Sequence, residues 1–133
     1  MLKFKFNNPN NSPILINTVM EKKYKTLKEF YPYYLTEHSD VTCRRLHYTG
    51  TTLLFVIIAV SIFTGNYAFM FLLPVVGYGF AWLGHYKFER NKPATFQYPL
   101  YSLASDFIMY YHFLTGQVGQ KVEDAKKTIG AAA

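Results

Sequence analysis

Cysteine is nearly absent from this sequence: Cys43 is the only one among 133 residues. A single thiol excludes an intrachain disulfide framework and the paired cysteines of zinc-finger-like sites. We interpret Cys43 as a small buried residue, because no supporting groups for a cysteine nucleophile are identifiable. The sequence also has no Gly-rich phosphate loop and no internal repeat, which argues against nucleotide-binding and solenoid classes.

A cleavable signal peptide is also absent. The first twenty residues contain only a short apolar stretch interrupted by Asn and Pro, where a signal peptide has a continuous apolar region. We expect residues 1–20 to be a flexible N-terminal arm and residues 117–133 to be a polar, solvent-exposed or frayed tail. Residues 21–116 would then form a single helical membrane domain.

The apolar residues are concentrated in segments, because half of all residues are hydrophobic while the mean hydropathy is only +0.01. Residues 46–63 carry no formal charge and, at about 1.5 Å per residue, reach nearly the thickness of a bilayer core. Residues 67–88 form a second such run, uncharged until its last residues, after a turn-forming Thr-Gly-Asn sequence. This pattern predicts a transmembrane helical hairpin.

Two more helices are predicted beside the hairpin. Residues 22–37 separate aromatic residues from lysines at helical spacing, as in an interfacial helix, with a kink or a new turn at Pro32. Residues 100–116 form a fourth helix, and hydropathy leaves open whether it lies in the interface, re-enters or spans the membrane. Its apolar residues follow one face: Leu103, Phe107, Tyr110 and Leu114. The predicted fold class is an all-α, integral membrane helical protein.

The net charge of +6 is explained by the positively charged flanks of the two predicted membrane spans. Lysines and arginines precede the first apolar run and follow the second, and the connecting turn has none. By the positive-inside rule, both open ends of the hairpin face the cytoplasm. Nucleic acid is not expected as a partner, because no known binding module and no basic stripe with interleaved aromatics is present.

Three histidines are predicted to converge at that cytoplasmic boundary. His38 ends the first helix, His47 begins the first span, and His85 ends the second span. Glu89 shares a helical face with His85 at a spacing of four residues. A mixed set of histidines and carboxylates suits non-heme Fe(II) and O₂ chemistry, to which Asp106 could add a ligand or an outer-shell partner. The competing interpretation is a polar cluster at a wet membrane interface.

Other polar residues receive simpler interpretations. Arg44 and Arg45 serve topology and lipid headgroups, although one of them could bind a substrate carboxylate. His112 lies six positions after Asp106, on a different helical face, and is interpreted as an interfacial or packing residue.

Two segments carry a resemblance to a known family: FYPYYLTEHSDVTCRRLHYTGT and GHYKFERNKPATFQYPLYSLASDFIM. Through them, residues 24–116 resemble the 2-hydroxy fatty acid dioxygenase family, small membrane proteins long catalogued as a domain of unknown function, with fungal and bacterial members. It implies an Fe(II)-dependent enzyme that uses O₂ to cleave C1–C2 of a 2-hydroxy fatty acid, giving the acid shorter by one carbon (fatty acid α-oxidation). The family's recurring positions fall on His38, His47, His85, Glu89, Asn91, Pro93, Thr95 and Asp106.

The resulting hypothesis places Fe(II) on His38, His47 and His85 with Glu89 or Asp106. Arg44, Arg45, Asn91 and Thr95 are candidates for substrate binding. The partners would be a 2-hydroxy fatty acid, O₂ and the lipid bilayer, and a homo-oligomer is compatible with the sequence. We expect a bacterial inner membrane, or the endoplasmic reticulum in a eukaryote, with the site facing the cytoplasm. A metal-dependent lipid hydrolase and a non-catalytic membrane scaffold or lipid-binding protein remain alternatives.

Overall fold

The computed structural model describes residues 22–132, so the arm expected over residues 1–20 lies outside the described residues. Within that range all regular elements are helical and there is no strand, which confirms the all-α prediction there. The helices and short helical turns, in order, are α1 (Leu27–Thr36), α2 (Val41–Thr64), η1 (Tyr67–Leu72), α3 (Leu73–Gly84), η2 (His85–Glu89), η3 (Ala94–Phe96), α4 (Pro99–Leu114) and α5 (Val118–Ala132).

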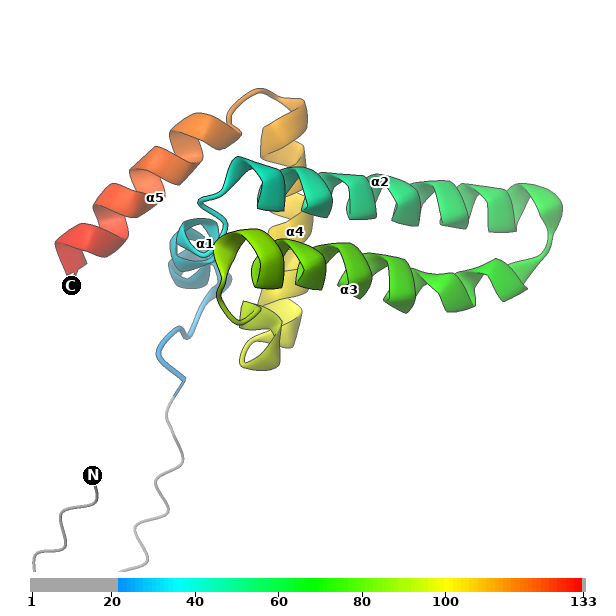
Figure 1. The fold of residues 1–133 in the computed structure, drawn as a ribbon, viewed down its shortest axis with the longest axis horizontal. Helices are drawn as coiled ribbons and strands as arrows, with labels where there is room; N and C mark the ends of the chain where they lie inside the picture. Colours follow the sequence, from blue (N-terminus) through cyan, green and yellow to red (C-terminus); the bar gives the residue numbers. More distant parts are fainter. Residues whose placement is uncertain (1–21, 133) are drawn as a thin grey trace, which may run out of the picture.

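The predicted hairpin is formed by α2 and α3, which lie antiparallel and project away from the other helices (Figure 1). α2 begins before residue 46 because the Asp40 carboxylate caps it, accepting hydrogen bonds from the backbone N–H groups of Thr42 and Cys43. It ends at Thr64 and is capped by Gly65, which has a left-handed φ of 67°. Within residues 22–132, Val41–Thr64 and Tyr67–Glu89 are the two segments long and apolar enough to cross a membrane, judged by length and composition.

Glycines let the two arms of the hairpin approach closely. A Cβ atom added at Gly84 would lie 2.9 Å from Cys43 Sγ and 3.3 Å from Cys43 Cα. A Cβ at Gly50 would lie 3.2 Å from Cβ of Phe80. Small residues at such contacts are typical of helices that pack in membranes.

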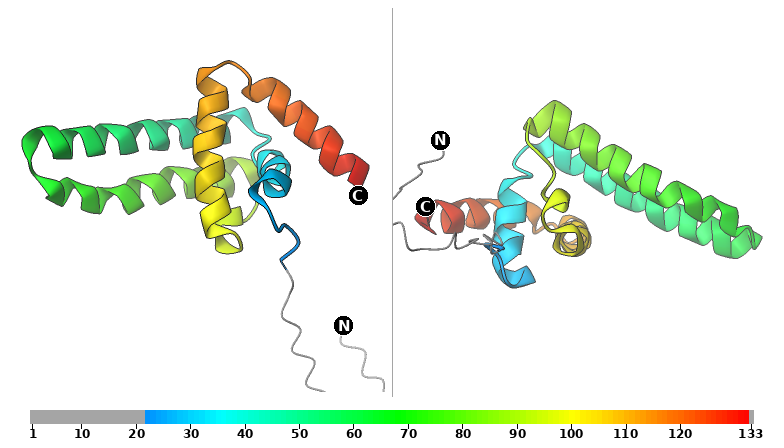
Figure 2. Two further views of the ribbon diagram at one scale, coloured as in Figure 1. Left: turned by 180° about the vertical axis from the view of Figure 1, so that it is seen from behind. Right: turned by 90° about the horizontal axis from the view of Figure 1, so that it is seen from below.

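The other helices gather at the open end of the hairpin. α4 crosses behind α2 and α3 at a steep angle near their base, and α1 lies beside it (Figures 1 and 2). The aromatic face of the predicted interfacial helix faces the protein core, where Phe30 and Tyr34 of α1 are buried. On α4 the buried residues include Ser105 and Met109, while the predicted apolar face stays largely exposed. The buried side chains of α4 are therefore small or flexible, whereas those of α1 include large aromatic rings.

The C-terminal segment differs from its predicted state. Instead of a frayed polar tail, α5 packs on α1, and Val122 and Ala125 are buried in the main core. Together with Val118 and Ile129, these residues form an apolar stripe at helical spacing. The polar majority in the segment's composition concealed this stripe.

Candidate metal centre

The structure brings three histidines together from separate elements. His38 lies in the turn between α1 and α2, His47 in the second turn of α2, and His85 at the end of α3. All three are buried. The ring of His38 lies 4.5 Å from the ring of His47 and 4.5 Å from that of His85, between centroids, and the other two rings are 5.2 Å apart.

Each of these histidines has its Nδ1 atom engaged by an oxygen. The Nδ1 of His38 lies 2.6 Å from the carbonyl oxygen of Tyr34. The Nδ1 of His47 lies 2.8 Å from Oδ1 of Asp106, and that of His85 lies 2.7 Å from Oδ1 of Asn91. Because these oxygens accept hydrogen bonds, each Nδ1 carries the proton. The free lone pair of each neutral ring is therefore on Nε2.

Two of these Nε2 atoms face each other directly. Nε2 of His38 and Nε2 of His47 are 3.2 Å apart, close to the roughly 3.4 Å expected between two nitrogens bound tetrahedrally to one metal ion. Burial and the neighbouring His47 and His85 hold the pKa of His38 well below its usual value, which disfavours a proton as the bridging cation. Oxygen partners on the second ring nitrogen are the usual outer support of metal-binding histidines. The donor set thus fits a metal ion.

Cys43 is the fourth member of this cluster. Its Sγ and one nitrogen from each of the three histidines all lie within 4.8 Å of one another, and all four side chains are buried. The sequence interpretation gave Cys43 no ligand role. Cys43 lies four residues before His47, on the same face of α2, and this spacing is the signal that could have indicated a ligand role for Cys43.

The loop after α3 is shaped to hold His85. η2 is a π-helical turn, a feature that is frequent at functional sites. It ends at Arg90, a non-glycine residue with a left-handed φ of 55°. The next residue, Asn91, turns back to His85 and also donates from Nδ2 to the carbonyl and carboxylate oxygens of Glu37. Asn91, predicted to bind substrate, is placed here as a support for His85.

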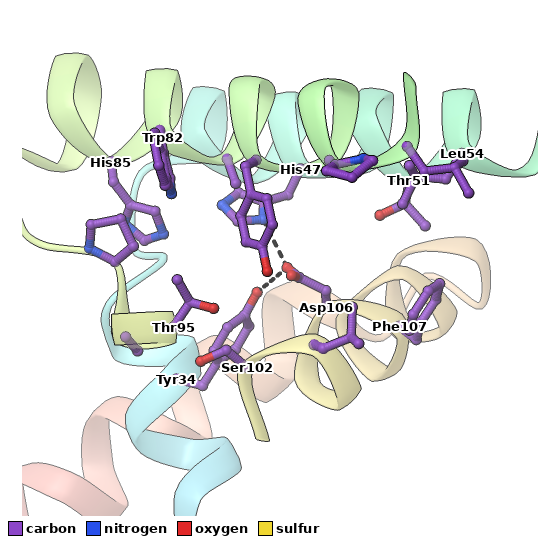
Figure 3. A pocket seen from close by; sticks show the side chains of 18 of the residues that line it. Tyr34, His47, Thr51, Leu54, Trp82, His85, Thr95, Ser102, Asp106 and Phe107 are labelled. Carbon is purple, nitrogen blue, oxygen red and sulfur yellow. Dashed lines mark hydrogen bonds and ion pairs between the residues drawn. The ribbon is translucent and has the colours of Figure 1, made fainter. Parts of the chain in front are cut away.

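Two predicted carboxylates take different positions. Asp106 reaches from α4 and accepts hydrogen bonds from Nδ1 of His47 and from the Tyr34 hydroxyl (Figure 3). It contacts the cluster through His47. Glu89 lies outside the group of four and accepts from the backbone N–H of Asp40. That contact ties η2 to the start of α2, so the structure does not bring Glu89 to the metal-binding position.

The remaining predicted residues lie at varied distances from the cluster. Arg44 is buried and donates to the carbonyl oxygens of His38 and Ser39, which fixes the turn between α1 and α2. Arg45 is exposed. Thr95 lines the cavity beside the histidines. His112 pairs instead with the Tyr31 hydroxyl.

A cavity of about 360 Å³ opens beside the cluster. His47, His85 and Asp106 form one end, and its walls come from α2, α3 and α4 (Figure 3). Most of the lining is apolar, which is typical of small-molecule sites in which a few polar groups fix orientation.

The fold and the site together define a helical protein with an apolar hairpin and, at its base, a buried histidine and cysteine cluster able to bind a metal ion. Residues 24–118 match the family described as 2-hydroxy-palmitic acid dioxygenase Mpo1-like, and the chain belongs to that family. No curated protein and no solved structure matches the chain.

Proposed function

We propose that the protein is an Fe(II)-dependent dioxygenase that cleaves the C1–C2 bond of 2-hydroxy fatty acids. The observation that carries this proposal is the convergence of three buried histidine rings, each with an oxygen on its Nδ1 atom, beside an apolar cavity. Membership of the family supports the reaction class. With O₂ as the oxidant, the cleavage balances as the acid shorter by one carbon, carbon dioxide and water, so no further reductant is needed.

The roles of the residues follow from their contacts. His38, His47 and His85 would hold the iron, which when bound supplies a Lewis acid for the substrate's carboxylate and hydroxyl groups and a site for O₂. Asp106, Tyr34 and Asn91 keep the imidazoles in one orientation and tautomer. Thr95 and Ser102 line the same end of the cavity and can donate hydrogen bonds to the polar end of the substrate.

The hairpin suits a water-insoluble substrate. Large apolar side chains are exposed along its length, including Phe55 and Ile62 of α2 and Phe71 of η1. We place the hairpin in a bilayer, with the cluster at the cytoplasmic boundary and α4 lying in the interface. A bacterial inner membrane, or the endoplasmic reticulum in a eukaryote, would supply the substrate directly from lipid.

The direct test is metal content followed by oxygen uptake. After anaerobic purification and loading with Fe(II), we expect one iron per chain in the wild type and in His112→Ala, and a loss of most bound iron in His85→Ala. The loaded protein should consume O₂ with 2-hydroxypalmitate and release pentadecanoate. Because His112 lies outside the cluster, it controls for the loss of an imidazole elsewhere.

The same measurements distinguish the alternatives. A zinc-dependent lipid hydrolase would bind metal but consume no oxygen with the hydroxy acid. A non-catalytic lipid-binding protein or scaffold would bind no transition metal, and His85→Ala would then behave like the wild type. Either result would reject the dioxygenase proposal.

A further inference from the structure

The cavity beside the histidines is elongated along the hairpin. α2 and α3 are antiparallel, and their contacts keep one register: Gly50 lies against Phe80, and Gly77 lies against Leu54. The cavity lining follows this register away from the cluster. It passes from His47 and His85, through Leu54 and Gly77, to Ile58 and Leu73. The cavity is therefore a groove between the two arms.

The polarity of the lining changes along this groove. The end at the histidines also carries Asp106, Thr95 and Ser102. The Oγ atom of Ser102 is buried and has no hydrogen-bond partner within residues 22–132, so a ligand's polar group would satisfy it. At the far end, Ile58, Leu73 and Pro74 offer no polar side-chain atom. This gradient matches a single-chain amphiphile with its polar head at the cluster.

We propose that the groove binds the acyl chain of the substrate, with the methyl end toward the tip of the hairpin, and that Gly77 sets the accepted chain length. The identity of the amphiphile as a fatty acid rests on the proposed function. The direction in which its acyl chain runs is inferred from the lining of the groove alone. Because Gly77 has no side chain, the groove stays open past the level of Leu54.

The dimensions give the expected chain lengths. From the level of the histidines, Gly77 lies about 11 Å along the hairpin and Ile58 about 17 Å, at about 1.5 Å per helical residue. A carbon chain with bonds of about 1.5 Å and angles near 111° advances about 1.25 Å per carbon. Roughly nine carbons therefore reach Gly77, and roughly fourteen reach Ile58. A side chain at residue 77 should exclude long acids and admit short ones.

The chain offers a matched pair of glycines for the test. A Cβ at Gly77 would lie 3.7 Å from Leu54 Cδ2, an ordinary contact, so a larger residue fits the backbone while its side chain enters the groove. Gly79 is on the same helix, and a Cβ there would meet nothing within 4 Å. It does not line the cavity. Gly77→Leu and Gly79→Leu thus make the same substitution in the same helix, with the same change in helix propensity.

The binding experiment uses Trp82, the one tryptophan of the chain, which lines the groove. Palmitate and octanoate, each brominated a few carbons from the carboxyl group, are titrated into the metal-free protein in detergent, and quenching of Trp82 fluorescence reports binding. For Gly77→Leu we expect at least tenfold weaker binding of the palmitate and a change below twofold for the octanoate. Each methylene excluded from the groove removes about a fourfold factor in affinity. Gly79→Leu should match the wild type for both acids.

Several results would overturn this assignment. Equal palmitate binding by the two leucine variants would do so, as would a loss in Gly77→Leu that is the same for both chain lengths. Displacement of the brominated palmitate by a diacyl phospholipid as effectively as by palmitate would assign the groove to membrane lipid. Gly77→Val carries the same test if Gly77→Leu does not fold. Chain-length-dependent binding without oxygen uptake by the iron-loaded protein would reject the proposed function and leave the groove assignment standing.

Discussion

Tyr34 supports two histidines through two different atoms. Its carbonyl oxygen accepts from Nδ1 of His38, and its hydroxyl donates to the Asp106 carboxylate that holds His47. Burial and the adjacent Asp106 hold the pKa of Tyr34 well above its usual value, so the phenol keeps its proton and remains a donor. A single residue of α1 therefore links the orientations of two rings.

Replacing the hydroxyl of Tyr34 should weaken metal binding without removing a ligand. In Tyr34→Phe the carbonyl contact with His38 remains, and Asp106 loses only one of its two hydrogen bonds. We expect Fe(II) affinity to fall about tenfold, at the low end of outer-shell effects. Competition with a chromophoric chelator measures it. Tyr31→Phe is the control, because the Tyr31 hydroxyl pairs with His112; equal affinities in the two variants would contradict the role given to Tyr34.

The sequence was sufficient to predict that the three histidines lie together. It was not sufficient to predict which residues hold their rings in place. Apolar runs and flanking charges were enough to put His38, His47 and His85 at one level, and the structure places their rings together. The positions of Glu89 and Asn91 depend on a π-helical turn and a left-handed Arg90. Neither feature has a sequence pattern that marks it. Reading residues 85–89 as an α-helix therefore put Glu89 in the cluster.

At the scale of elements, the contact between α2 and α3 is closest where the cluster lies. Gly84 immediately precedes His85 and faces Cys43, which lies one turn before His47. The separation of the two arms at this point therefore sets the distance between His47 and His85. The absence of a side chain at residue 84 is a geometric requirement of the cluster.

Adding one methyl group at this contact should separate the arms. In Gly84→Ala the new Cβ would lie 2.9 Å from Cys43 Sγ and 3.3 Å from its Cα, so one arm must shift. We expect the free energy of unfolding to fall by about 1–3 kcal/mol, as for overpacked cores. Thermal unfolding of the metal-free protein in detergent measures the change.

Two further variants test the cause. Cys43→Ala combined with Gly84→Ala should recover part of the lost stability, since the nearest clashing atom is removed. Gly79→Ala should be neutral or slightly stabilising, because alanine favours a helix by up to about 1 kcal/mol over glycine. If Gly79→Ala lowered stability as much as Gly84→Ala does, the close approach would not be the reason.

At the scale of the whole molecule, the cluster lies where the hairpin joins the helices at its base. The hairpin supplies His47, His85 and the groove, whereas the base supplies Tyr34 and Asp106. Hydropathy was enough to predict the hairpin, since each arm is a nearly uncharged run. Hydropathy could not predict how the helices at the base pack, because α5 is polar in composition and its apolar stripe has only four residues. The packing of α1 therefore depends on α5, a segment that hydropathy alone does not mark as part of the core.

This dependence makes α5 a distant support of the cluster. Val122 is buried against the core that includes Phe30, Tyr34 and Leu35 of α1. A carboxylate at residue 122 would be buried without a partner or would push α5 off α1. We expect Val122→Asp to lower the free energy of unfolding by about 2–4 kcal/mol and to weaken Fe(II) binding as well, because α1 carries the supports of His38 and His47. Gly119→Asp adds the same charge at an open position in the first turn of α5, where a carboxylate is favourable. Chemical denaturation measures the stability of both variants, and chelator competition measures their iron affinity. Normal iron affinity in a destabilised Val122→Asp protein would show that α5 supports the fold without supporting the cluster.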